Sequence, residues 1–171
     1  MNSKKNKIKK NNKITGVFKK TRKRFFSSKI INSNSTIFFI LIVLDLMVKK
    51  IIREGINVEY ECVKINFIKN TGIVFGLFQG SSKIIAVASI IVILLILMNH
   101  KMISETKEKR FSLMLIISGL LSNAIDRLFL GFATDFLCIG FWPCFNLADT
   151  YLVIGVLSYV FFTLKEKKKK P

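Results

Sequence analysis

Four apolar segments separated by charged clusters set the strongest limit on how this chain can fold. They run over Ile37–Val48, Ile84–Met98, Phe111–Ile125 and Leu147–Leu164. An α-helix rises 1.5 Å per residue, so about twenty residues are needed to cross a hydrocarbon layer about 30 Å thick. Flanking residues, including lysines whose apolar stems let the ammonium reach water, extend each segment toward that length. We therefore predict a mainly α membrane protein with four transmembrane helices.

Positive charge is distributed unevenly along the chain, whose net charge is +18. Residues 1–29 hold twelve Lys or Arg and no acid; with the connection 99–110 and the tail 165–171 they account for twenty-one of the 28 basic residues. The positive-inside rule places such segments in the cytoplasm, so both termini are expected there. The predicted organisation is a disordered basic cytoplasmic extension over 1–29, a four-helix membrane domain over 30–164 and a basic cytoplasmic tail over 165–171.

The basic blocks are suited to nucleic acid or to anionic lipid headgroups. Because they adjoin apolar runs of membrane length, we expect headgroups and no nucleic acid. The first apolar run contains Asp45 and is followed by lysines rather than by a small-residue cleavage site. We interpret it as an uncleaved crossing.

The opposite face of the membrane is expected to consist of residues 53–80 and 126–146. In the first stretch, NVEYECVKINFIKN alternates polar and apolar positions, which predicts a short strand pair resting on the membrane surface. Asn70 and Gly72 then open NTGIVFGLFQG, with further glycines at 76 and 80. This segment is either a simple turn or a loop that presents backbone groups to an extended peptide.

Charged residues in or beside membrane helices are costly and therefore point to function. Asp45 and Lys49 are four positions apart, in the acid-then-base order that favours a pair on one helix face. Asp126 and Arg127 are adjacent and point in different directions, so we expect them to tie the outer loops to the helix end rather than to pair with each other.

Asp135 and Asp149 lie fourteen positions apart in the aromatic and aliphatic stretch GFATDFLCIGFWPCFNLAD. Taken separately, Asp149 is explained as an acid at a helix start and Asp135 as a loop residue in water. Both lie at the same membrane face, however, and the turn containing Gly140 and Pro143 can bring them together. Two close carboxylates share one proton, which is the chemistry of an aspartic peptidase that activates water without a metal, a cofactor or a covalent nucleophile.

Three cysteines, Cys62, Cys138 and Cys144, cannot all pair within one chain. No Cys-x-x-Cys spacing occurs and His100 is distant in sequence, so no zinc site is expected. We predict free thiols, with a Cys138–Cys144 bridge as the alternative.

Four motifs in this order resemble those of the lipoprotein signal peptidase (signal peptidase II) family of bacterial membrane aspartic peptidases. They are DLMVK at 45–49, NTGIVFG at 70–76, SNAIDRLFLGFATDF at 122–136 and FNLAD at 145–149. The resemblance covers about 37–164 and implies that Asp135 and Asp149 are the catalytic dyad. It departs from the family at Leu46, where glutamine is usual, at Val74 for alanine and at Ser122 for glycine. The implied residues that shape the site or bind substrate are Asp45, Lys49, Asn70, Gly72, Asn123, Asp126, Arg127 and Asn146.

The resemblance implies four transmembrane helices with a small extracytoplasmic β-cradle, in a bacterial plasma membrane and with the active site at its outer face. The implied substrate is a prolipoprotein whose lipobox cysteine carries a diacylglyceryl group, cut just before that cysteine. We expect a monomer that needs no metal or cofactor. The alternatives are a non-enzymatic membrane scaffold or transporter subunit whose acids pair structurally, and an ion-coupled carrier.

Overall fold

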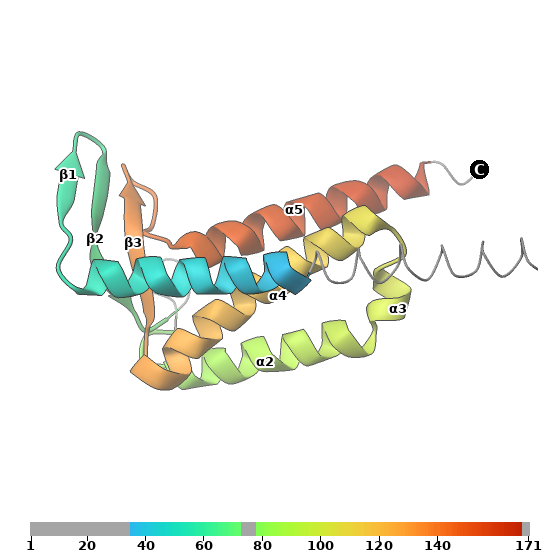
Figure 1. Cartoon of the computed structure of the whole chain (residues 1–171), viewed down its shortest axis with the longest axis horizontal. Helices are drawn as coiled ribbons and strands as arrows, with labels where there is room; N and C mark the ends of the chain where they lie inside the picture. Colours follow the sequence, from blue (N-terminus) through green and yellow to red (C-terminus); the bar gives the residue numbers. More distant parts are fainter. Residues whose placement is uncertain (1–34, 73–77, 169–171) are drawn as a thin grey trace, which may run out of the picture. The chain divides into compact units, whose positions relative to one another are not determined.

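The structure is a computed structural model that describes residues 35–72 and 78–168. The elements that Figure 1 labels belong to the compact unit Phe38–Pro171. The predictions made for residues 1–29, for Val74 and Gly76, and for residues 169–171 of the tail lie outside the described residues.

Helices make up most of the described chain, as predicted (Figure 1). Each predicted apolar segment forms the core of one helix. A further short helix, α3, turns the chain between α2 and α4; the sequence did not predict it, because HKMI is too short to show an apolar period. The helices span 35–53, Ser82–Met98 (α2), His100–Ile103 (α3), Lys107–Leu130 (α4) and Leu147–Lys167 (α5).

Two helices in the described part of the chain, α4 and α5, are long and apolar enough to cross a membrane by length and composition. α2 is apolar but has 17 residues. The helix over 35–53 carries Asp45, Lys49, Lys50 and Arg53 toward its end. The prediction of four transmembrane helices therefore stays a prediction.

Three antiparallel strands form one sheet in the order β1-β2-β3: β1 spans Val58–Tyr60, β2 Val63–Asn70 and β3 Ala133–Ile139. β1 and β2 confirm the predicted strand pair. β3 was not predicted from the sequence, which assigned residues 126–146 to the outer face without a strand. Its first four residues are all buried, so the sequence lacks the alternation that marks a strand with one solvated face. β2 pairs with β3 so that Ile68 lies opposite Asp135.

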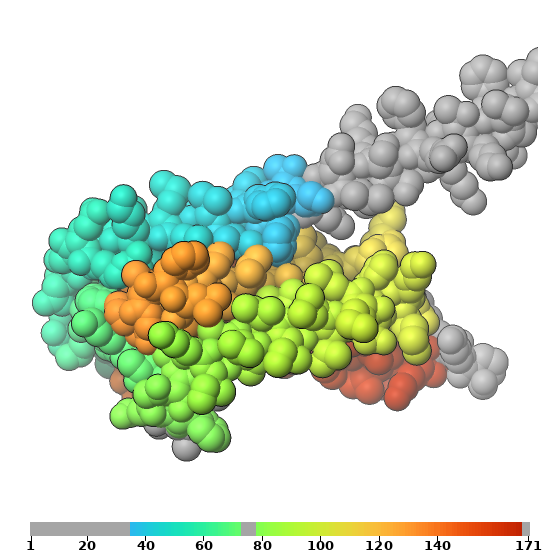
Figure 2. All heavy atoms as spheres, turned by 90° about the horizontal axis from the view of Figure 1, so that it is seen from below, coloured from blue at the N-terminus to red at the C-terminus, as the bar shows by residue number. Residues whose placement is uncertain are grey.

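α4 is the central helix of the unit and packs against both α2 and α5. In its most apolar window 56% of the residues are buried, against 11% for α5. Figure 2 shows α2 lying across one face, with the end of α4 beside it. α4 and α5 approach closely at Gly119 and Gly155, where an added Cβ would meet backbone atoms of the facing helix. Small residues permit such close contact between membrane helices.

A partly buried ion pair marks the start of α4, and a glycine in the left-handed conformation marks its end. At its start, Lys109 is buried and its Nζ lies 2.5 Å from Glu166 Oε2 near the end of α5. At its far end Gly131 has a φ of +81°, the left-handed conformation that glycine adopts without strain. The chain therefore turns directly from α4 into β3.

Cys138 and Cys144 form a disulfide, so the prediction of free thiols was wrong for these two residues. β3 ends at Ile139 and reverses at Gly140, which has a φ of +53°. This reversal brings the two cysteine Cα atoms to 4.2 Å, close enough for their sulfur atoms to bond. Cys62 is free and exposed, so one of the three cysteines keeps a free thiol.

Gly119→Ala is expected to lower the free energy of unfolding by about 1–3 kcal/mol. The new Cβ would lie 2.3 Å from the backbone carbonyl oxygen of Ala148, so α5 would have to move away from α4. Reversible unfolding in detergent micelles measures the loss. Leu128→Ala, at an exposed position of α4, is the control. Equal stability of Gly119→Ala and the parent protein would contradict the close packing.

Candidate active site

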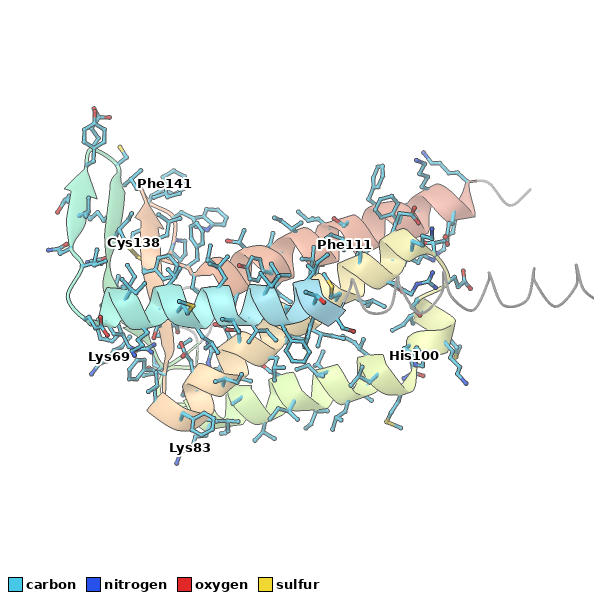
Figure 3. All side chains as sticks on the ribbon, viewed as in Figure 1. Lys69, Lys83, His100, Phe111, Cys138 and Phe141 are labelled. Atoms are coloured by element: carbon cyan, nitrogen blue, oxygen red, sulfur yellow. A yellow bond between two sulfur atoms is a disulfide. The ribbon has the colours of Figure 1, made fainter. Side chains whose placement is uncertain are left out.

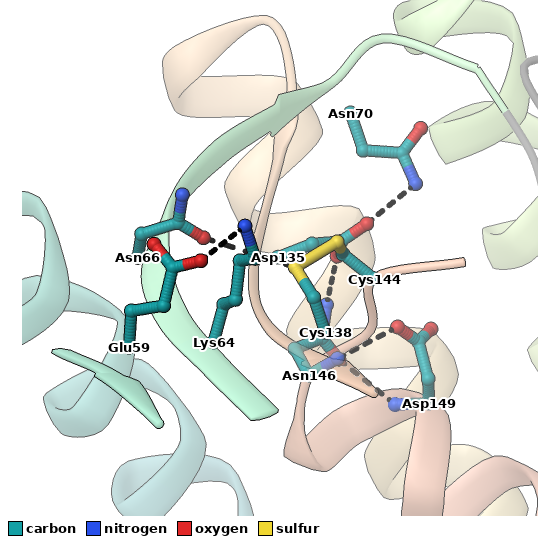
Figure 4. Close-up of a disulfide and its surroundings, with 9 residues drawn as sticks. All are labelled: Glu59, Lys64, Asn66, Asn70, Asp135, Cys138, Cys144, Asn146 and Asp149. Atoms are coloured by element: carbon teal, nitrogen blue, oxygen red, sulfur yellow. Dashed lines mark hydrogen bonds and ion pairs between the residues drawn. A yellow bond between two sulfur atoms is a disulfide. The ribbon is translucent and has the colours of Figure 1, made fainter. Parts of the chain in front are cut away.

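Two carboxylates meet through one asparagine where the sheet joins α5 (Figure 4). Asp135 lies in β3 and is 2% exposed, and Asp149 lies in the first turn of α5. Asn146 Nδ2 donates to Asp135 Oδ1 at 2.8 Å, and the Asn146 backbone N–H donates to Asp149 Oδ2 at 3.1 Å. The chain reversal after β3 thus brings acids fourteen positions apart to the same residue.

Asn146 holds this position because it begins α5. Its side-chain oxygen accepts a hydrogen bond from the Asp149 backbone N–H at 2.9 Å, while the Asp149 carboxylate accepts one from the Asn146 backbone. This reciprocal capping box satisfies two N–H groups that a helix start leaves without partners. FNLAD therefore both starts the helix and orients one carboxylate. Asp149 is also the first-turn acid that its position predicted.

The other carboxylate oxygen of Asp135 is held by the end of β2. Asn70 Nδ2 donates to Asp135 Oδ2 at 2.8 Å, and Asn70 Oδ1 accepts from the Gly72 backbone N–H at 3.0 Å. Arg127 Nη2 in turn donates to the Gly72 carbonyl oxygen at 2.9 Å. The turn at Asn70 is thus tied to Asp135 on one side and to the end of α4 on the other.

A buried ammonium group lies behind the two acids. Lys49 is fully buried, and its Nζ lies 2.7 Å from Asp45 Oδ2 and 3.4 Å from Asp126 Oδ2. The first contact is the intrahelical pair that the spacing predicted. Lys49 Nζ also donates to Asn123 Oδ1 at 2.9 Å, and Asn123 Nδ2 donates to Asp149 Oδ1 at 2.8 Å. Lys49 therefore sets which way the Asn123 amide points, and through it one oxygen of Asp149.

Asp45 joins the first helix to the start of α5. Its Oδ1 accepts from the Ala148 backbone N–H at 2.9 Å, and its Oδ2 accepts from Ser122 Oγ at 2.5 Å. Ser122 is the residue that replaces the expected glycine, and its hydroxyl supplies Asp45 with a further donor. Asp45 thus positions the helical turn that carries Asp149.

Asp126 and Arg127 do not pair with each other and bind different segments, as their adjacent positions predicted, although one of these segments is the strand β3 rather than a loop. Arg127 binds the turn at Gly72, whereas Asp126 Oδ2 accepts from the Thr134 backbone N–H at 3.0 Å. Asp126 therefore fixes β3 one residue before Asp135.

Two residues of this network, Arg53 and Thr134, were missed by sequence reasoning. Arg53 Nη1 donates to Thr134 Oγ1 at 2.7 Å and lies 3.7 Å from Asp126 Oδ1. The signal for Arg53 was its spacing, because it follows Asp45 and Lys49 at intervals of four, on the same helix face. No such signal marks Thr134, because a threonine in a strand that was not recognised is indistinguishable from one in a loop.

The electrostatic environment of Asp135 favours its neutral form. Burial, and after it the charge of Asp149, raise the pKa of Asp135 from 3.8 to about 6, although hydrogen bonds from Asn70 and Asn146 act in the opposite direction. Protonation of this carboxyl thus changes near pH 6 rather than near pH 4. A carboxylic acid and a carboxylate held by the same asparagine are the two partners that general acid and general base catalysis require.

The comparisons with known proteins agree on one family. A family model described as signal peptidase (SPase) II matches residues 37–165. A lipoprotein signal peptidase of Halothermothrix orenii is 30% identical over 138 residues, which are 77% of this chain and 95% of that protein. A lipoprotein signal peptidase of Borrelia hermsii is 36% identical over 157 residues, covering 79% of this chain and 92% of that protein.

Solved structures show the same fold. One bacterial membrane enzyme superposes with a TM-score of 0.74 at 25% identity, over 82% of this chain and 93% of its own. A second bacterial membrane enzyme, at 24% identity, gives a TM-score of 0.66 over 79% of this chain and 94% of its own, which is a likeness of fold alone.

Lys49→Met is expected to destabilise the protein by about 3–5 kcal/mol, because it leaves the buried Asp45 carboxylate without its cation. The double variant Asp45→Asn with Lys49→Met removes both charges, so it should lose less than the single variant. Unfolding of all four proteins in micelles completes a double-mutant cycle. Strictly additive losses would show that the two groups do not interact.

Asp149→Asn is expected to lower the pKa of Asp135 from about 6, because it removes the second of the two causes that raise it. The pKa should stay above 3.8, because burial, the larger cause, remains. In this variant the Asp135 carboxyl should lose its proton at a lower pH than in the parent protein. Titration of ¹³C-labelled aspartate by NMR, assigned with Asp135→Asn, measures the shift. Glu59→Gln, at an exposed carboxylate, should leave the pKa of Asp135 where it was.

Proposed function

The chain belongs to the signal peptidase II family, and from that premise we propose that it is a membrane aspartic endopeptidase whose catalytic dyad is Asp135 and Asp149. Membership of the family makes it a peptidase that processes signal peptides. The proposal about mechanism is carried by one observation: Asn146 binds both carboxylates, one from a buried strand and one from a helix start.

The proposed reaction uses a single proton shared by the dyad. The ionised acid accepts a proton from water as the water oxygen attacks the scissile carbonyl carbon, and the protonated acid donates a hydrogen bond to the carbonyl oxygen. The resulting tetrahedral intermediate then collapses, with the nitrogen of the leaving peptide taking up a proton from the dyad. Neither a covalent intermediate nor a metal is needed for these steps.

The remaining site residues are proposed to hold the dyad and to line the substrate path. Asn70 and Asn123 each donate to one of the two acids, and both amides are neutral. Gly72 lies in the turn beside Asp135, and because its backbone N–H and carbonyl oxygen bind Asn70 and Arg127, it is proposed to shape the substrate path rather than to pair with the peptide. Lys49 contacts both Asp45 and Asp126, and Arg127 binds the Gly72 carbonyl oxygen, so these four charged residues are proposed to be positioning residues.

The proposed substrate is a prolipoprotein whose cysteine carries a diacylglyceryl group, with the cut just before that cysteine. The acyl chains would keep this cysteine at the bilayer surface. A dyad that lies at the sheet end of α5 meets the scissile bond at that height, so the peptide need not leave the membrane. The depth of the dyad in the membrane is therefore part of the proposed specificity for the lipidated substrate.

The proposed arrangement in a bacterial plasma membrane has four crossings, with both termini in the cytoplasm and the sheet as an extracytoplasmic cradle. α4 and α5 supply two crossings of sufficient length. In the first helix, the ion pair of Asp45 and Lys49 lowers the cost of inserting its charges. We further propose that the basic segments 1–29 and 165–171 attract anionic headgroups, and that the enzyme acts as a monomer.

Replacing Asp135 or Asp149 with Asn is expected to reduce processing of a lipidated precursor at least about a hundredfold. The protein should still insert into the membrane, because the amide keeps the size of the carboxyl. Processing is followed by the mobility shift of the precursor, and insertion by membrane fractionation. Glu59→Gln removes an exposed carboxylate on β1, which β2 separates from β3. This variant should process the precursor normally.

The same experiment separates the peptidase from a membrane scaffold or carrier whose acids only pair structurally. Full processing by either Asn variant would reject the dyad. Loss of insertion together with loss of processing would show instead that the acid is needed for folding. Asp135→Glu and Asp149→Glu would then distinguish a structural from a catalytic requirement, because they keep the charge but displace the carboxyl group.

A further inference from the structure

The loop that joins β3 to α5 presents two aromatic side chains on a fixed turn. This aromatic loop, residues 138–144, includes the last two residues of β3 and is closed by the Cys138–Cys144 disulfide. Within it the Trp142 backbone N–H donates to the Ile139 carbonyl oxygen at 2.9 Å, and the Gly140 backbone N–H donates to the Cys62 carbonyl oxygen at 2.7 Å. One covalent bond and two hydrogen bonds therefore hold the loop in one conformation.

The rings on this loop point away from the protein. Phe141 is 98% exposed and Trp142 58% exposed, so the described residues leave Phe141 almost completely uncovered. Contact of such rings with water is unfavourable, and apolar groups held out on a rigid turn mark an interaction surface. Tryptophan combines an apolar ring with an N–H donor, which suits the boundary between water and hydrocarbon.

The position of the aromatic loop favours lipid as its partner. Phe145 pairs with Leu137 through backbone hydrogen bonds of 2.9 and 3.0 Å, and Asn146 then begins α5. α5 has the length and composition of a membrane span, and only 11% of its apolar window is buried in the protein. Figure 3 shows the labelled Phe141 beside β3, on the side where α5 begins. The loop therefore continues the exposed apolar surface of α5 at the level where the helix begins.

We propose that the aromatic loop is a membrane-interface anchor, in which Phe141 and Trp142 insert among the lipid headgroups of the outer leaflet and fix the height of the dyad. The assignment to the outer leaflet and the link to the dyad rest on the proposed function. Cys138 stands three positions after Asp135, and Cys144 stands five positions before Asp149. An anchor between them thus acts on both segments that carry the carboxylates, and it sets their distance from a bond held at the bilayer surface.

Trp142 is the only tryptophan in the chain, so its fluorescence reports on this loop alone. The full-length protein is reconstituted in phosphatidylcholine and phosphatidylglycerol vesicles that carry bromine either near the headgroup or near the end of the acyl chain. We expect blue-shifted emission and stronger quenching by the shallow bromine. Phe141→Ser should shift the emission to the red and reduce the shallow quenching. Phe161→Ser, an equally drastic change at an exposed ring toward the other end of α5, should leave both unchanged.

Three results would overturn the anchor. The first is tryptophan emission that neither bromine quenches. The second is quenching that changes only when a lipidated precursor is added, which would make the loop a substrate contact. The third is shielding from water that grows with the protein-to-lipid ratio without bromine quenching, which would make a second copy of the chain the partner.

The measurement does not depend on cleavage, so it separates the anchor from the proposed function. Asp135→Asn protein should show the same quenching as the parent protein. Normal processing without quenching would refute the anchor and keep the dyad, whereas quenching in a protein whose Asn variants process normally would refute the dyad and keep the anchor.

Discussion

The structure depends on how one buried ammonium group is neutralised. Lys49 has no access to water, and an unpaired charge in such surroundings costs several kcal/mol. Its Nζ therefore holds Asp45 from its own helix and contacts Asp126 and Asn123 from α4. Because Asp45 also binds the backbone at Ala148, the same charge fixes the start of α5. Three helices are thus positioned by contacts that a single charge makes necessary.

The network separates the charges that hold the fold from the carboxylates of the proposed dyad. Lys49 reaches Asp149 only through the neutral amide of Asn123, and Asp135 accepts from the amides of Asn70 and Asn146. A direct ion pair would strongly favour the ionised form of an acid, whereas an amide donor orients the carboxylate with a smaller effect on its protonation. The two acids therefore remain free to respond to each other, as a shared proton requires. This supports the proposed division into dyad and positioning residues.

The helices and the strand pair could be predicted because their patterns are local. Apolar runs place each helix core, and alternation places β1 and β2. β3 could not be predicted, because burial of both faces by α4 and the loops removes the alternation from ATDFLCI. The disulfide was missed for a related reason, since the distance between Cys138 and Cys144 depends on where that strand ends. In the candidate site, Arg53 follows the spacing of its helix, whereas Thr134 has a role only once β3 is paired.

By itself the sequence determined the residue types of the site and their order: acids, amides and one lysine at fixed places among apolar segments, enough to place the chain in its family. Only the tertiary structure decided which of them touch. Asp45 and Ala148 are 103 positions apart, and Asp135 and Asn70 are 65 apart, yet both pairs are hydrogen-bonded. The physical reason is that a buried polar group needs a partner, but its sequence does not say which one, because that choice follows from how the helices and the sheet pack.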